Sequence, residues 1–303
     1  MIDGALLLDK PLGLSSNAAL QNAKRLYGAA KAGHAGTLDP LASGLLMVLF
    51  GEATKFAGPL LDADKEYLAA LKLGQRTSTG DAEGAVLQSR DVSFSQETLA
   101  AVLERFRGEI EQVPPMHSAL KFQGQRLYEL ARRGESVERA PRRITIHSVE
   151  RRKLDGDRLE FEVSCSKGTY IRSLAADIAN RLGTLGYLAG LRRLSVDPFA
   201  GAAMYTLEDL EARRSQEGEA GLDQLLLGAD FAFGDLSSVH LDAEATRTLL
   251  LGQTARGIEP AGPGTARAYD SEGRFLGLVE GQPDGRVRPV RLFVPVADPS
   301  PAA

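Results

Sequence analysis

The chain has 303 residues, enough for about two domains, and its 43% hydrophobic and 25% charged residues exclude an intrinsically disordered protein. No apolar stretch approaches the ~18–20 residues that a membrane-spanning helix needs, and the first residues lack the basic and apolar segments of a signal peptide. The net charge is −4, which taken alone argues against a nucleic-acid partner.

The N-terminal part predicts a strand, a helix, a loop and a second strand. The apolar residues 5–8 predict a buried strand. A helix is expected to start at Ser16, an N-cap residue type, and to end at Gly28. Glycine and proline are frequent in residues 31–44, which predicts a loop, and the continuous apolar run 45–50 predicts a strand with both faces covered.

The middle of the chain alternates strands and helices. Residues 67–73 predict a strand that places Tyr67 on the core face, and residues 77–84 predict a polar loop. Ser95 is expected to cap a helix that carries Leu99, Val102, Leu103 and Phe106. A hairpin (144–154 and 159–165), a helix with its apolar stripe over 171–182 and a strand at 191–195 are expected to follow.

The C-terminal third changes character. Residues 201–235 predict a weakly helical connector, and strands at 266–270, 274–280 and 287–294 predict a small β-rich module. The tail, 298–303, is expected to be disordered.

Charge is unevenly distributed along the chain. Residues 105–200 hold 18 Lys/Arg against 12 Asp/Glu, whereas residues 201–235 hold 2 against 8. The basic block favours a surface that binds a polyanion. The alternative is two solvated surfaces of opposite sign.

The most informative stretch is the signature loop, residues 33–44 (GHAGTLDPLASG). It offers a carboxylate, Asp39, and an imidazole, His34, among glycines that allow close approach of a ligand. By residue type alone, Asp39 before Pro40 could be a turn residue, and His34 could simply hydrogen-bond the loop.

This loop resembles the signature of the TruB family of tRNA pseudouridine synthases, which residues 33–44 fit without a gap. Several other segments resemble the family in order and spacing, and together the resemblance covers about residues 3–200. These segments are LDKP (8–11), GEATK (51–55), DKEY (64–67), SALK (118–121), SKGTYIR (166–172) and LRRL (191–194).

The resemblance implies a cofactor-free and metal-free isomerisation of a flipped-out T-loop uridine, number 55 of tRNA, to pseudouridine. Asp39 matches the family's catalytic aspartate, a nucleophile for C6 of the base or C1′ of the ribose, and Arg172 matches the arginine that pairs with it. Tyr67 matches the tyrosine that stacks on the target base and handles the C5 proton, and Leu191 resembles a pocket leucine. Taken alone, these three would be a surface arginine, a core tyrosine and an ordinary strand leucine.

Further residues are expected to contact RNA. His34 matches the histidine that holds the flipped-out T-loop, and Asp81 resembles a recurrent family acid near the site. Lys10 and Lys65 are candidate phosphate-binding or structural lysines. The arginines of the basic block are expected to contact the tRNA backbone; these are Arg126, Arg132, Arg133, Arg142 and Arg143.

We therefore expect an α+β protein with a mixed, mainly antiparallel sheet and flanking helices, followed by a small module similar to a PUA-type RNA-binding domain. The expected catalytic domain is 1–235, with a basic RNA-binding insert at about 105–150 and the acidic connector at 201–235; the module spans 236–297. We expect a cytoplasmic monomer whose partner is tRNA, since the single Cys165 suits a reducing compartment. The alternative from another class is a tRNA-binding folding factor with catalysis secondary. A sugar-cleaving glycosidase would need a second acid that the loop does not supply.

Overall fold

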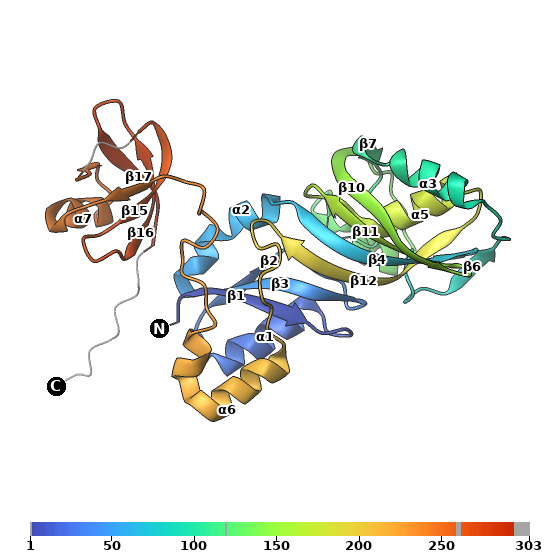
Figure 1. Ribbon diagram of the computed structural model, residues 1–303, viewed down its shortest axis with the longest axis horizontal. Coiled ribbons are helices and arrows are strands. Elements are labelled where there is room, and N and C mark those ends of the chain that lie inside the picture. The colour runs from blue at the N-terminus through green and yellow to red at the C-terminus, as the bar shows by residue number, and fades with distance from the viewer. Residues whose placement is uncertain (1, 119, 259–261, 294–303) are drawn as a thin grey trace.

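The computed structural model describes residues 2–118, 120–258 and 262–293, so the predicted tail at 298–303 lies outside the described part of the chain. An eight-stranded sheet in the order β1-β3-β12-β4-β11-β10-β7, with β2 paired to β3, forms the larger body (Figure 1). Every pairing in it is antiparallel except β12 with β3. The strands are β1 (Gly4–Lys10), β2 (Ala32–Ala35), β3 (Ala42–Phe50), β4 (Lys65–Leu73), β7 (Gly108–Gln112), β10 (Arg142–Asp155), β11 (Arg158–Cys165) and β12 (Gly186–Val196).

Two groups of helices cover the two halves of this sheet. Helices α1 (Ser16–Leu26) and α6 (Leu207–Asp223) lie together over β1 and β3, where they bury one hydrophobic core (Figure 1). Helices α3 (Gln96–Glu104) and α5 (Ile171–Arg181) pack on the half formed by β4, β10, β11 and β12 and bury a second core. The predicted α+β class and the expected order of these elements are confirmed.

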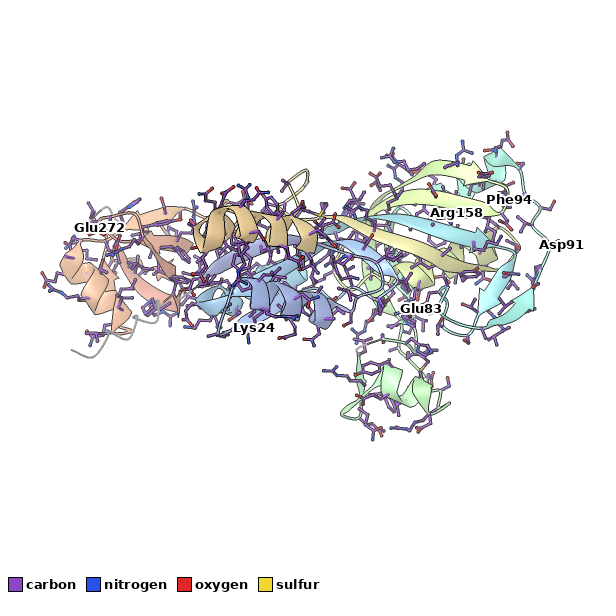
Figure 2. All side chains as sticks on the ribbon, turned by 90° about the horizontal axis from the view of Figure 1, so that it is seen from below. Lys24, Glu83, Asp91, Phe94, Arg158 and Glu272 are labelled. Carbon is purple, nitrogen blue, oxygen red and sulfur yellow. The ribbon has the colours of Figure 1, made fainter. Side chains whose placement is uncertain are left out.

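Short elements fill the connections. A hairpin follows β4, and a second hairpin with one short helix projects from the body (green in Figure 2, below Glu83). The elements are η1 (Gly51–Phe56), α2 (Ala57–Asp62), β5 (Gln75–Thr77), β6 (Val86–Ser89), β8 (Lys121–Phe122), β9 (Gln125–Arg126) and α4 (Leu127–Arg132).

The C-terminal part forms a separate five-stranded sheet in the order β13-β15-β16-β17-β14. The three predicted strands are confirmed, but the sequence interpretation missed two short strands and a helix that Asp242 caps through the N–H of Ala245. The elements are β13 (Ser238–His240), α7 (Ala243–Leu250), β14 (Ala255–Arg256), β15 (Gly264–Tyr269), β16 (Phe275–Gly281) and β17 (Arg286–Leu292).

Two local expectations at the N-terminus were wrong. Ser15, not Ser16, caps α1 by accepting the N–H of Ala18, because the Ser16 hydroxyl turns instead to the signature loop. Residues 31–44 are not loop throughout, since 32–35 form β2. Strand β12 pairs with β3 only as far as Gly44, so the β3 edge beyond it is open and β2 pairs there.

An aromatic cluster joins the C-terminal sheet to the larger body. Phe56, at the end of η1, is fully buried and packs against Phe233 of the connector and against Phe275 and Phe293 of the module, with ring centroids 5.5, 5.7 and 6.4 Å away. Because each of these rings comes from a different segment, this contact fixes how the module sits on the body.

Phe56→Ala is expected to lower the free energy of unfolding by about 3–5 kcal/mol, because it opens a cavity among three other rings. Urea denaturation measures the change. Leu61→Ala, on the neighbouring helix α2 with 49% of Leu61 exposed, serves as the control and should cost less than ~1 kcal/mol. Equal costs for the two variants would contradict the role given to this cluster.

Candidate active site

The signature loop is tied to the body on both sides of Asp39. The Ser16 hydroxyl donates to the Leu38 carbonyl at 2.8 Å and accepts the Leu38 N–H at 2.7 Å. On the other side, the N–H of Gly13 donates to the Pro40 carbonyl at 2.8 Å. These bonds hold the backbone around Asp39 in one conformation, so its carboxylate is presented in a fixed place.

Asp39 faces the guanidinium of Arg172. The Asp39 Oδ2 lies 3.1 Å from Nη2 of Arg172, and the Arg172 side chain is 9% exposed whereas that of Asp39 is 43% exposed. The same Nη2 donates a hydrogen bond of 2.6 Å to the carbonyl oxygen of His117, in the segment that leads into the projecting hairpin. The sequence-predicted pair is therefore brought together, with the cation buried and the carboxylate open to a ligand.

A second carboxylate completes this arrangement. Asp81 is 3% exposed, and its Oδ2 lies 3.5 Å from Nη1 of Arg172. Its Oδ1 accepts hydrogen bonds from the hydroxyl of Thr79 and from the N–H of Glu83, so the carboxylate cannot turn away. One guanidinium thus lies between a buried carboxylate and an exposed one.

Gln112 orients Arg172, and the sequence interpretation missed it. Its amide accepts the Tyr170 N–H at 2.8 Å and donates to the Tyr170 carbonyl at 3.2 Å, at the first turn of α5. Because these bonds fix the start of the helix, they fix the direction of Arg172 two residues later. A lone glutamine at the end of a strand gives no signal from which this role could be read.

A cavity of about 610 Å³ opens next to the signature loop, and neither Asp39 nor Tyr67 lines it. Its walls include Pro40, Leu41 and the predicted pocket residue Leu191, which pairs with Ala69 of β4, together with the charged residues Glu83, Arg158, Glu160 and Arg192. Leu12, 70% exposed, stands at this cavity and was not predicted. Such a space suits a planar ring.

Tyr67 lies on β4 and His34 on β2, two strands that do not pair with each other. Tyr67 is partly buried on the core side of β4, as predicted. Burial raises the pKa of its phenol, and the charge of Arg193 acts in the opposite direction. Burial and the charge of Arg193 lower the pKa of His34 in β2, which favours the neutral imidazole; its buried Nδ1 has no hydrogen-bond partner among the described residues.

The two lysines turn inward. Lys10 is fully buried, and its ammonium donates to the carbonyls of Pro11 at 2.9 Å and Leu14 at 2.6 Å. Lys65 is 8% exposed and donates to three carbonyls at the end of α2, those of Leu60, Leu61 and Ala63. The sequence left open whether these lysines bind phosphate or support the structure, and their inward placement favours the structural role.

The predicted RNA-contacting arginines occupy two places. Arg126 and Arg133 are exposed on the projecting hairpin and helix, and Arg142 and Arg143 are exposed at the start of β10. The side chain of Arg132 lies outside the described part of the structure. Arg142 and Arg143 pair with Gln112 and Glu111 of β7, so Arg142 lies opposite the glutamine that holds the start of α5.

The described residues contain no group of three or more His, Cys, Asp or Glu side chains that could hold a metal ion. Within residues 2–118, 120–258 and 262–293, no helix is long and apolar enough to cross a membrane.

Known proteins share this architecture over nearly the whole chain. In a crystal structure of a Cbf5-Nop10-Gar1 complex, one chain superposes with a TM-score of 0.69 at 26% identity, covering 91% of this chain and 78% of that one. The tRNA pseudouridine synthase B of a Pseudomonas putida strain is 49% identical over 292 residues, and that of Chromohalobacter salexigens is 51% identical over 299 residues. The matches cover 96% of this chain, and 96% and 94% of the two relatives.

The mixed sheet with a carboxylate and guanidinium at its centre, followed by a small β module, thus belongs to the pseudouridine synthase class of folds. The N-terminal domain model of the TruB family pseudouridylate synthases matches residues 24–171, and two models of the C-terminal parts match residues 172–233 and 237–293. The chain belongs to the TruB family, as the signature loop indicated.

Burial lowers the pKa of Lys65 from 10.5 to about 8. Below about pH 8 the folded protein holds Lys65 charged, at a cost in desolvation. Between about pH 8 and 10.5 Lys65 is neutral in the folded protein but still protonated in the unfolded chain. The free energy of unfolding should therefore rise with pH in this window. We expect the ε-carbon resonance of Lys65, assigned by its loss in Lys65→Met, to titrate with a midpoint near pH 8. A midpoint at the ordinary value would contradict the burial of this ammonium.

Proposed function

We propose that this protein isomerises a uridine in the T-loop of tRNA, at position 55, to pseudouridine. One observation carries the proposal: Asp39 presents a half-exposed carboxylate against a buried guanidinium 3.1 Å away. The relatives named tRNA pseudouridine synthase B support the choice of substrate.

The isomerisation requires few chemical groups from the protein. The bond from ribose C1′ to N1 of the base breaks and a bond from C1′ to C5 forms, while C5 loses a proton and N1 gains one. The atoms and electrons balance without an oxidant or a water molecule being consumed. A nucleophile that attaches to C6 or C1′ and later leaves is sufficient, and we assign this role to Asp39.

Arg172 keeps that nucleophile ready. A guanidinium in contact with a carboxylate holds the carboxylate oxygens in a fixed direction. Because Arg172 is itself 9% exposed and is anchored by Asp81 and by the His117 carbonyl, little reorganisation is needed when substrate arrives. We assign to Arg172 the orientation of Asp39 and the stabilisation of its charge.

Leu191, Tyr67 and His34 are the residues that we expect to hold a flipped-out uridine. A uridine inside the folded T-loop must be flipped out before the carboxylate can reach it. We place the flipped base next to Asp39, with Leu191 as a pocket residue, Tyr67 stacking on the base and handling the C5 proton, and His34 holding the displaced loop.

The basic surface supplies the remaining affinity. Arg126, Arg133, Arg142 and Arg143 are exposed, and their charges suit the phosphates of the T-arm. With them we propose a monomer that works on tRNA in the cytoplasm, in which the C-terminal module adds contacts to RNA outside the T-loop.

Tritium release from tRNA labelled at uridine C5 tests the proposal directly, because isomerisation must expel the hydrogen at C5. We expect the wild-type protein to release tritium, and Asp39→Asn to bind the same tRNA and release none within the detection limit. Asp62→Asn, an exposed carboxylate on α2, is the matched control and should keep the wild-type rate.

Release by Asp39→Asn at the wild-type rate would remove Asp39 from the reaction. Absence of release from the wild-type protein, with tRNA binding intact, would favour instead a tRNA-binding folding factor.

A further inference from the structure

Arg193 is a buried charge that the proposed reaction leaves unused. Its side chain is among the largest fully buried ones, with 1% of the residue exposed. No carboxylate of the described residues lies within ion-pair distance of it. An unpaired guanidinium is costly to bury, so its presence in the middle of a sheet beside the site calls for a specific purpose.

Two carbonyl oxygens hold the guanidinium in place. Nε donates to the Leu45 carbonyl of β3 at 2.7 Å, and Nη2 donates to the Gly36 carbonyl of the signature loop at 2.9 Å. The fit is close, because a Cβ added at Gly36 would come within 3.2 Å of Nη1. Since a guanidinium is planar and its N–H groups point in fixed directions, these two bonds also fix where the remaining donors point.

Those donors face Tyr67. Arg193 of β12 and Tyr67 of β4 are direct cross-strand partners, so their side chains leave the sheet on the same face. The positive charge of Arg193 acts on this phenol and opposes the rise in the pKa of Tyr67 that burial causes. A cation held beside a phenol favours the orientation in which the phenol oxygen faces the cation and the O–H points away from it.

We propose that Arg193 is a positioning residue that acts through Tyr67: anchored by the Leu45 and Gly36 carbonyls, it fixes the orientation of the phenol that meets the base. This inference rests on the proposed function and extends it to a residue that does not itself reach substrate. It also explains why a charge is used here. A neutral side chain of similar size lacks enough donors to hold two carbonyls and a phenol at once.

A double-mutant cycle separates this role from a merely structural one. Arg193→Met and Arg193→Lys are each made in the wild-type and the Tyr67→Phe backgrounds. Single-turnover pseudouridine formation, tRNA affinity and thermal unfolding are measured for all of them. Arg193→Met removes the buried charge together with its desolvation cost, so it is expected to fold.

In the wild-type background, we expect each Arg193 variant to slow single turnover by about tenfold or more, with tRNA affinity within about threefold of wild type. In the Tyr67→Phe background the same substitutions should slow turnover by less than about threefold, because the group through which Arg193 acts is gone. Arg213→Lys, an exposed arginine paired with Glu217 on α6, is the control and should change the rate by less than about twofold.

Equal losses in the two backgrounds would overturn the proposal, since a structural arginine adds its effect independently of Tyr67. Failure of both Arg193 variants to fold would also overturn it and would assign Arg193 to the fold. An inactive wild-type protein would instead mean that the proposed function is wrong. Because the wild-type protein is measured in the same experiment, this outcome is distinguished from a failure of the Arg193 proposal.

Discussion

The contact between Arg172 and Asp39 is the constraint on which the site depends. A carboxylate that is 43% exposed would sample many orientations, and here a buried guanidinium 3.1 Å away restricts it. That guanidinium is restricted in turn by Asp81 behind it and by the His117 carbonyl beside it. The exposed carboxylate is therefore held by a guanidinium that is itself buried and anchored.

The fold provides this arrangement by bringing distant segments to one place. Asp39 lies between β2 and β3, Arg172 begins α5, Asp81 follows the short strand β5, and His117 leads into the projecting hairpin. The parallel contact between β12 and β3 aligns Arg193 with Gly44 at the end of the signature loop. Ser16, in the first turn of α1, fastens the same loop from the other side. Sheet register, more than any single loop, determines the geometry of the site.

Much of this could be predicted from the sequence. Period-two and helical patterns gave the hairpin of β10 and β11, the stripe of α5 and the Ser95 cap of α3, since these depend on local sequence. Family resemblance indicated Asp39 and Arg172. The strand β2 could not be read from Gly-His-Ala, because it forms only where the β3 edge is left open. The role of Gln112 could not be predicted either, since its partner Tyr170 is far away in the chain. The burial of Lys10 and Lys65 was likewise not predictable, because it depends on how the surrounding elements pack.

Arg172→Lys is the most direct test of the central claim, because it keeps the charge and removes the planar group that spans two carboxylates and a carbonyl. The single-turnover rate is measured at saturating tRNA, together with the affinity for the same tRNA. We expect the rate to fall by about a hundredfold with affinity almost unchanged. A wild-type rate in this variant would show that Asp39 does not need the geometry described here.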